Sequence, residues 1–207
     1  MKKILLYTVI VLLASCTATT KTSKTKDLTP TEEINAFQEG LQSFYRSEET
    51  SPYREKVADF QGHDFFPIDL NYRVEAKYSS FDNEKFFDLP TSNKEIQKKY
   101  RKFGLLKFQL NGKEHELILY QNAKLMANPM YKDYLFLPFT DLTNSETTYG
   151  GGRYIDFRIP KGETTILDFN QAYNPYCAYV TGYSCPIPPE ENHLDIEVKV
   201  GIMLKDH

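Results

Sequence analysis

The sequence is notable first for what it lacks: it has no tryptophan, three cysteines and no long apolar run. The longest apolar stretch, residues 4–13, would span roughly 15 Å as a helix, about half of a ~30 Å hydrocarbon core. This excludes a transmembrane helix there. The chain also lacks an excess of positive charge, since its formal net charge is −3. Nucleic acid is therefore not expected as a partner.

Catalytic and metal-binding motifs are also missing. No G-x-S-x-G elbow is present, and the four histidines are scattered. The glycine run at residues 150–152 lacks the following Lys-Ser/Thr of a phosphate loop and precedes a predicted strand. Clustered ligands for a metal are absent, so we predict neither a metal nor a cofactor. The sequence leaves open whether the protein is an enzyme.

What the chain does have is an abundance of Tyr and Phe, with 15 and 14 residues respectively. Both suit pleated, half-buried surfaces, which favours β structure. Hydrophobic residues make up 41% of the chain and charged residues 26%, as in ordinary folded domains. We therefore expect a folded, mostly-β protein.

The first 15 residues are predicted to be a lipoprotein signal peptide. Lys2 and Lys3 precede the apolar stretch, and small residues precede Cys16. The run Leu13-Ala14-Ser15-Cys16 resembles the lipobox of bacterial lipoproteins, which implies cleavage before Cys16 and a diacylglycerol on its sulfur. The alternative is an ordinary cleaved signal that happens to contain a cysteine. By the same resemblance, the absence of aspartate after Cys16 favours an outer-membrane location facing the periplasm over the inner membrane.

Residues 16–28 are predicted to be a lipidated, flexible tether. Between Thr17 and Lys26 there are five Thr, one Ser and three Lys, and such a stretch buries too little surface to offset its ordering entropy. The first 26 residues contain five lysines and no acid, so removing them changes the charge from −3 to −8. The remaining domain, residues 29–207, is therefore acidic, and the lipid anchor is its expected link to the membrane.

The two other cysteines, Cys177 and Cys185, form an even pair in a protein predicted to be exported. An oxidising compartment favours a disulfide between them. The alternative is a metal site that also uses His193. Its gaps match no compact zinc pattern, so we predict the disulfide.

Two N-terminal helices and many short strands are predicted within residues 29–207. Thr29, Pro30 and Glu32 form a capping-box signature for a helix that ends near Arg46. Ser51-Pro52 suggests the cap of a shorter helix that reaches Phe60. Asn111-Gly112 predicts a hairpin with a type I′ turn. Further strands are expected at residues 72–76, near 86–87, and at 134–139, 152–158, 164–168 and 194–204. The pattern predicts an antiparallel sandwich or barrel.

An unusual group of motifs follows residue 137, and it resembles a known bacterial family, domain of unknown function 1684. The family signature has the form F-x-D-x-T, T-Y-G-x-G-R-Y, D-F-N-x-A-Y-N-P-x-C-A-Y and C-P-x-P-P-x-E-N-x-L. These elements correspond to Phe139 to Thr143, Thr148 to Tyr154, Asp168 to Tyr179 and Cys185 to Leu194. The resemblance covers nearly all of the chain after Cys16. It implies no activity, because members of the family have none that is agreed.

The same motifs supply the candidate site. The guanidinium of Arg153 matches a carboxylate, with Asp168 as the first candidate partner and Asp141 as the second. Polar side chains from neighbouring motifs complete the candidate ligand-binding set, which is Arg153, Asp168, Asn170, Tyr173, Asn174, Asp141 and Glu146.

Three interpretations of these residues stay open. The first is a cell-envelope lipoprotein that binds a small polar ligand or an envelope component. The second is an envelope hydrolase that acts on a glycan or ester through carboxylates of the set. The third is a structural or docking protein in which Arg153 and Asp168 join two strands. A pocket with a carboxylate of raised pKa would favour the enzyme, and a fully packed cluster would favour the structural role.

Overall fold

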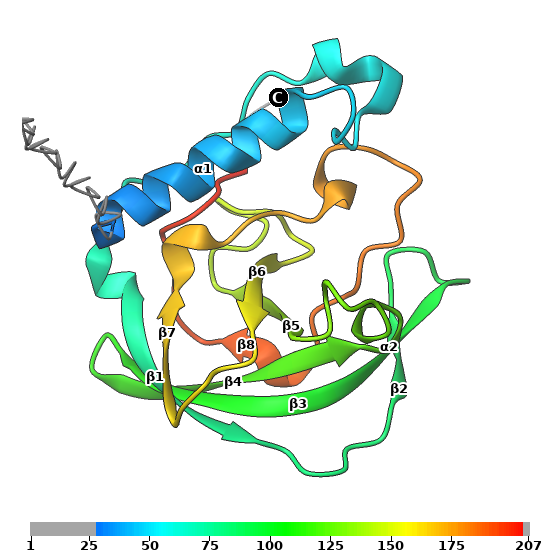
Figure 1. Cartoon of the computed structure of the whole chain (residues 1–207). Coiled ribbons are helices and arrows are strands. Elements are labelled where there is room, and N and C mark those ends of the chain that lie inside the picture. The colour runs from blue at the N-terminus through cyan, green and yellow to red at the C-terminus, as the bar shows by residue number, and fades with distance from the viewer. Residues whose placement is uncertain (1–27, 205–207) are drawn as a thin grey trace, which may run out of the picture.

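A computed structural model describes residues 28–204 of the protein. Its centre is a curled antiparallel sheet that forms a half-barrel (Figure 1). The strands are β1 (Arg73–Ser80), β2 (Phe87–Pro90), β3 (Gln97–Leu110), β4 (Lys113–Asn122), β5 (Tyr134–Asp141), β6 (Arg153–Arg158), β7 (Thr164–Asp168) and β8 (His193–Leu194). The main order is β6-β5-β4-β3-β1-β7, with β2 beside β3 and β8 beside β5. The predicted mostly-β antiparallel fold is confirmed.

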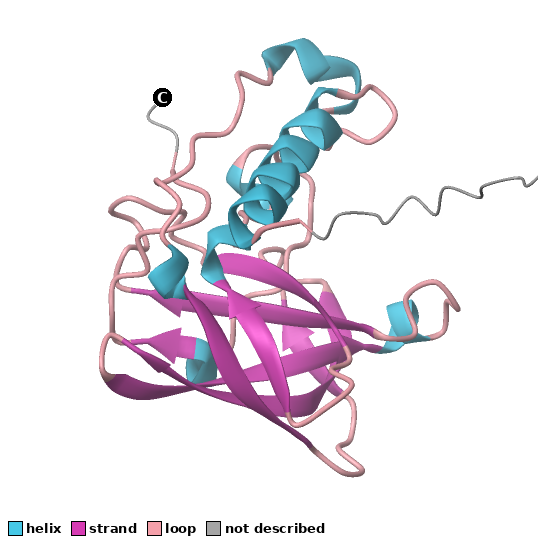
Figure 2. Ribbon diagram, turned by 60° about the vertical axis from the view of Figure 1, so that its left-hand side comes forward, coloured by secondary structure: helices cyan, strands magenta, loops and turns pink. Residues whose placement is uncertain are grey.

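The predicted first helix is α1 (Pro30–Arg46), and its limits agree with the prediction. The Thr29 side chain accepts from the Glu32 amide, and the Glu32 carboxylate accepts from the Thr29 amide at 2.7 Å. Ile34 and Tyr45 anchor the helix because both are buried. Figure 2 shows α1 on one side of the sheet, beside the loops. No helix within residues 28–204 combines the length and apolar character needed to cross a membrane.

The second predicted helix is a 3₁₀ segment, η1 (Arg54–Asp59), interrupted by a kink at Lys56. Ser51 does not cap it, although its hydroxyl accepts from the Tyr53 amide at 3.2 Å. The other short helices are η2 (Leu70–Tyr72), α2 (Ala123–Met126), η3 (Phe169–Gln171), η4 (Tyr176–Ala178) and η5 (Glu190–Asn192).

The predicted hairpin joins β3 to β4 at Asn111 and Gly112, whose φ angles are 52° and 74°. Positive φ at both turn residues is what a type I′ turn requires. Further back along β3, the register shifts between Lys102 and Gly104. This bulge reverses the alternation of side chains, so Tyr100 and Leu106 belong to different clusters on the two faces of the sheet.

The two faces of the sheet differ in composition. The inner face is aliphatic and phenylalanine-rich, with Leu106, Leu117, Leu137 and Phe169 fully buried in the main core. The outer face carries a separate cluster that is mostly aromatic, made of Leu89, Tyr100, Tyr120, Phe136 and Tyr154. An antiparallel sheet often exposes its second face to water, whereas here residues after β7 contact that face. Tyr173 packs against the cluster, Tyr154 donates to the Pro186 carbonyl and Tyr120 donates to Glu191.

The predicted strand at residues 194–204 is wrong. Only His193 and Leu194 form a strand there, in parallel with β5, and the segment beyond them enters no ladder apart from a single bridge between Phe65 and Ile202. The alternation that suggested a strand is real, because Val198, Val200 and Ile202 are buried. The Ile202 amide donates to the Ala172 carbonyl, whereas the backbone of Val198 and the Val200 carbonyl bond to side chains.

Candidate functional site

Arg153, the first residue of β6, has a fully buried side chain. Its Nη2 lies 2.8 Å from Asp141 Oδ2, so Arg153 pairs with Asp141 and not with Asp168. Burial lowers the pKa of Arg153, and the charge of Asp141 opposes that effect. Since arginine titrates far above neutral pH, the guanidinium stays charged.

The same guanidinium binds the backbone of the C-terminal segment. Nη2 donates to the Val198 carbonyl at 2.8 Å and Nη1 to the Val200 carbonyl at 2.6 Å. Asp141 Oδ1 accepts from the Val198 amide at 3.2 Å and from the Thr143 hydroxyl at 2.6 Å. We call Arg153, Asp141 and these backbone groups the arginine clamp. The clamp gives hydrogen-bond partners to the Val198 and Val200 backbone groups, which would otherwise need a neighbouring strand.

Glycine is required next to the clamp. Gly152 has a φ of 83°, and a Cβ at this position would lie 2.7 Å from the Phe139 carbonyl oxygen and from a ring carbon of Pro188. The glycine run that the sequence analysis singled out therefore permits close packing around Arg153.

Asp168 and Asn170 belong to a second group of polar contacts, which links η2, η3 and the adjoining strands. The Asn170 side chain accepts from the Asp69 amide and donates to the Asp69 carbonyl, both at 3.0 Å. Asp168 lies 3.4 Å from Arg73, which also pairs with Glu33 of α1 at 2.8 Å. These contacts join α1, β1 and β7.

The remaining candidate residues belong neither to the arginine clamp nor to the contacts of Asp168 and Asn170. Asn174 is buried and donates to the Tyr179 hydroxyl at 2.9 Å, whereas Glu146 is exposed in a turn. Asp168 also borders a hollow of about 330 Å³. Tyr173 lines a different cavity, described next. The structure does not bring the seven predicted residues into one pocket.

The outer face of the sheet contains a cleft of about 460 Å³, which we call the tyrosine cleft. One wall comes from the strands and the other from the loop after β7. Its lining residues are Lys98, Tyr100, Leu125, Tyr134, Phe136, Tyr154, Tyr173, Pro175, Tyr176, Tyr183, Ser184, Cys185 and Pro186.

Several tyrosine hydroxyls of the cleft already have protein partners. Tyr134 and Tyr173 both donate to Asp156 Oδ1, at 2.7 and 2.6 Å, and Tyr154 donates to the Pro186 carbonyl. Burial raises the pKa of Tyr173, and the charge of Asp156 raises it further. These phenols therefore stay neutral, and their rings supply flat apolar surface.

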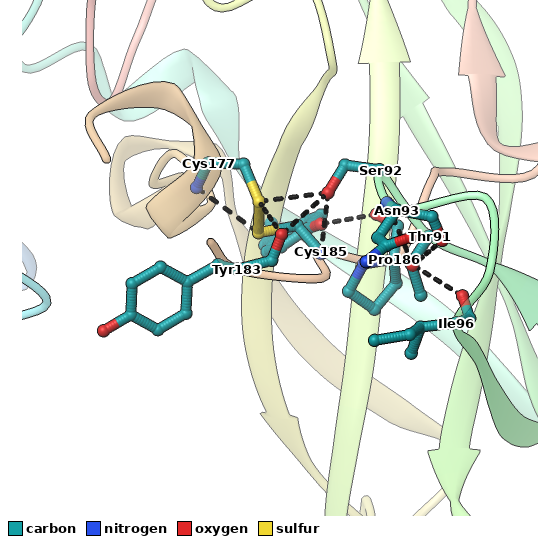
Figure 3. Close-up of a disulfide and its surroundings, with 9 residues drawn as sticks. Thr91, Ser92, Asn93, Ile96, Cys177, Tyr183, Cys185 and Pro186 are labelled. Atoms are coloured by element: carbon teal, nitrogen blue, oxygen red, sulfur yellow. Dashed lines mark hydrogen bonds between the residues drawn. A yellow bond between two sulfur atoms is a disulfide. The ribbon is translucent and has the colours of Figure 1, made fainter. Parts of the chain in front are cut away.

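A disulfide fixes the loop wall of the cleft, as predicted. Cys177 and Cys185 are bonded, and Ser92 connects this loop to the residues after β2 (Figure 3). The Ser92 hydroxyl accepts from the Cys185 amide at 3.1 Å and donates to the Tyr183 carbonyl at 3.2 Å. The disulfide thus holds the loop that carries Tyr176 and Tyr183.

Three carboxylates that a hydrolase could use each contact a different partner. Asp141 pairs with Arg153, Asp168 with Arg73, and Asp156 accepts from two tyrosines. Within residues 28–204, no group of three His, Cys, Asp or Glu side chains is placed to hold a metal ion. These three carboxylates therefore do not form one group in the structure.

Most of the cleft was not predicted from the sequence. Its lining comes from positions as far apart as Lys98 and Pro186, and although six lining residues lie in the family motifs, only Tyr173 was in the candidate set. The available signal was the excess of tyrosine together with its alternation along strands: Tyr134 and Phe136 fall on the face of β5 opposite Leu135 and Leu137.

Comparison with known proteins supports the family and the fold. Residues 58–203 match the family described as protein of unknown function DUF1684. A solution NMR structure of an uncharacterised protein from Haloarcula marismortui has 32% sequence identity and a TM-score of 0.63, covering 83% of this chain and 92% of that one. A comparison with curated proteins gives no match. The chain therefore belongs to the DUF1684 family.

Proposed function

We propose that this protein binds a small molecule in the tyrosine cleft. The observation that carries the proposal is an outer sheet face that is aromatic and covered, yet leaves a cavity of about 460 Å³. Small-molecule sites in proteins typically measure roughly 300 to 1,000 Å³ and combine apolar walls with a few polar groups. The tyrosine cleft has that size and composition.

Binding is favoured over catalysis by the groups that face the cavity. Its lining in residues 28–204 includes neither a carboxylate nor a histidine. Three phenols, Tyr134, Tyr154 and Tyr173, already donate to protein acceptors, so their chief contribution to a ligand is the ring surface. The disulfide-closed loop fixes one wall in advance, which lowers the entropy cost of binding.

The same proposal places the domain at an envelope membrane. Its basis is the lipobox-like run that ends at Cys16, followed by a tether rich in threonine and lysine. Several acyl chains on Cys16 would make attachment effectively permanent. The ligand would then be one that occurs in the envelope, with the outer membrane facing the periplasm as the proposed location.

Filling the cleft tests the binding proposal. Ser184 lines the cavity, and Ser184→Trp would occupy it, whereas Thr181→Trp places the same ring on an exposed part of the same loop. The neutral dye N-phenyl-1-naphthylamine gains fluorescence in apolar surroundings. We expect wild type and Thr181→Trp to bind it alike and Ser184→Trp to bind at least about tenfold more weakly.

Two results would contradict the proposal. One is a wild-type protein that leaves the dye fluorescence unchanged, and the other is Ser184→Trp binding as tightly as wild type. Thermal unfolding of all three proteins verifies that a loss of binding is not a loss of folding.

The anchor is tested separately with Cys16→Ala. This variant should lose labelling by radioactive palmitate and appear in the soluble fraction, whereas the wild-type protein requires detergent. Detergent-dependent extraction of unlabelled Cys16→Ala would contradict the lipobox interpretation.

A further inference from the structure

We infer that the ligand of the tyrosine cleft carries an anionic group, which Lys98 and Lys124 bind at one end of the cavity. This inference rests on the proposed binding function and adds the chemical class of the ligand.

Lys98 belongs to the aromatic face of the sheet. It pairs with Leu89 across β2 and β3 and stands two residues before Tyr100, so the three side chains share one face. The side chain of Lys98 is half-buried and lines the cleft. A lysine stem packs on apolar surface in this way while its ammonium stays available.

Lys124 lies at the opening that continues from the cleft. A second hollow of about 630 Å³ shares Lys98, Tyr100 and Leu125 with the cleft and adds Lys124 to the lining. The Asn122 side chain accepts from the amides of Lys124 and Leu125 at 2.9 and 3.0 Å and so fixes the start of α2. Lys98 therefore lines both hollows, and Lys124 lines the second one, which adjoins the cleft at their three shared residues.

Neither lysine forms an ion pair with any residue between 28 and 204, whereas the neighbouring Lys99 pairs with Asp88 at 2.9 Å. Burial lowers the pKa of Lys98, and the positive charge of Lys124 lowers it further. Two cations that repel each other beside a cavity without carboxylates are stabilised when an anion enters between them.

The contrast with the rest of the chain strengthens this inference. The protein is slightly acidic, with a formal charge of −3 for the full sequence, so its net charge does not favour anions. A local pair of free lysines at the cleft opening reverses that preference. Tyrosine and phenylalanine rings deeper in the cleft then suit a flat apolar or aromatic body. The expected ligand is an amphiphile with a carboxylate or phosphate head.

A matched pair of dyes separates the two parts of this ligand. 8-Anilinonaphthalene-1-sulfonate and N-phenyl-1-naphthylamine share the aromatic body, and the former adds a sulfonate. Each is titrated into wild type, Lys98→Gln/Lys124→Gln and the control Lys107→Gln/Lys199→Gln, which removes two exposed lysines that line neither hollow. We expect the double variant to bind the sulfonate dye about tenfold or more weakly and the neutral dye as wild type does. Lys107→Gln/Lys199→Gln should bind both dyes as wild type does.

The outcomes distinguish the inference from the proposed function. Equal binding of the sulfonate dye by wild type and the double variant overturns the anion inference but leaves the cleft as a binding site. Failure of wild type to bind either dye overturns the proposed function as well. Added salt should weaken the binding of the sulfonate dye and not that of the neutral dye. An affinity for the sulfonate dye that stays unchanged at high salt also counts against the inference.

Competition with the bound sulfonate dye then defines the anion. Dodecanoate, dodecyl phosphate and neutral dodecanol carry the same chain. Displacement by dodecanoate alone assigns a carboxylate ligand, and stronger displacement by dodecyl phosphate assigns a phosphate. Displacement by dodecanol that equals that of both anions contradicts the inference.

Discussion

Arg153 and Tyr154 are neighbours in β6, yet they belong to opposite sides of the molecule. Arg153 points into the core, where Asp141 and two backbone carbonyls occupy both of its terminal nitrogens. Tyr154 points outward and lines a cavity. The terminal nitrogens of Arg153 are engaged within the protein, and its buried Nε has no hydrogen-bond partner within residues 28–204, whereas the region around Tyr154 leaves room beside its rings. The comparison teaches that the polar residues most suggestive of a site in the sequence can be the ones that the fold itself uses.

Alkaline pH should affect the tyrosine region most strongly. Burial raises the pKa of Tyr45, Tyr100, Tyr120 and Tyr154, in the case of Tyr100 to about 12. Above about pH 10 the unfolded chain loses these phenolic protons while the folded chain keeps them, so the free energy of unfolding falls as pH rises. Each tyrosine contributes about 1.4 kcal/mol per pH unit, or roughly 5 to 6 kcal/mol for four.

Thermal unfolding followed by circular dichroism from about pH 9 to 11 measures this fall. Tyr100→Phe should reduce the slope, and the exposed Tyr131→Phe should leave it unchanged. A midpoint that stays constant over this range would show that the buried tyrosines do not govern alkaline stability.

Arg153→Met should have the next largest effect. It leaves Asp141 as a buried charge without its partner and frees the carbonyls of Val198 and Val200. Breaking a buried pair costs about 3 to 5 kcal/mol, which lowers the thermal midpoint by roughly 6 to 20 °C in a chain of this size.

The control is Arg158→Met in the same strand. Its exposed pair with Asp133, at 2.7 Å, should contribute less than about 1 kcal/mol. Equal destabilisation by the two substitutions would contradict the description of Arg153 as a clamp.

Removal of the disulfide by Cys177→Ser and Cys185→Ser should cost about 2.5 kcal/mol, because the unfolded chain gains loop entropy. It should also weaken dye binding, since the loop carries Tyr176 and Tyr183. Reducing agent should reproduce both effects in wild type and have none in the variant. Unchanged dye affinity after reduction would show that the cleft does not depend on this wall.

The smallest change is expected for Tyr134→Phe, which removes one of the two hydroxyl donors to Asp156 Oδ1. Because the Tyr173 hydroxyl still serves that oxygen, the cost should be about 1 kcal/mol by urea denaturation. A loss above about 3 kcal/mol would indicate that Asp156 requires both donors.

Features that depend on local chemistry could be predicted from the sequence. The capping box at Thr29, the turn at Asn111-Gly112 and the pairing of Cys177 with Cys185 all appear as predicted. Each is decided by residues near one another in the chain. Strand limits were predicted well where a neighbouring strand completes the ladder, as for β5 and β7.

Predictions failed where the partner was distant or unusual. Residues 194–204 alternate like a strand, but the side chains of Arg153 and Asp141 replace the neighbouring backbone at Val198 and Val200. The other backbone bonds of this segment go to several separate segments and not to one strand. Asp168 was the expected partner of Arg153, yet it pairs with Arg73. The cleft was missed because its walls come from segments separated by scores of residues, and periodicity alone does not say what covers an outer face.

A double titration tests the central claim most directly. The neutral dye is added to Arg153→Met and to Ser184→Trp at a temperature where both are folded. We expect Arg153→Met to be less stable but to bind the dye with wild-type affinity, whereas Ser184→Trp should keep its stability and lose the dye. A folded Arg153→Met protein that fails to bind, together with normal binding by Ser184→Trp, would place the ligand at the arginine clamp and contradict the account.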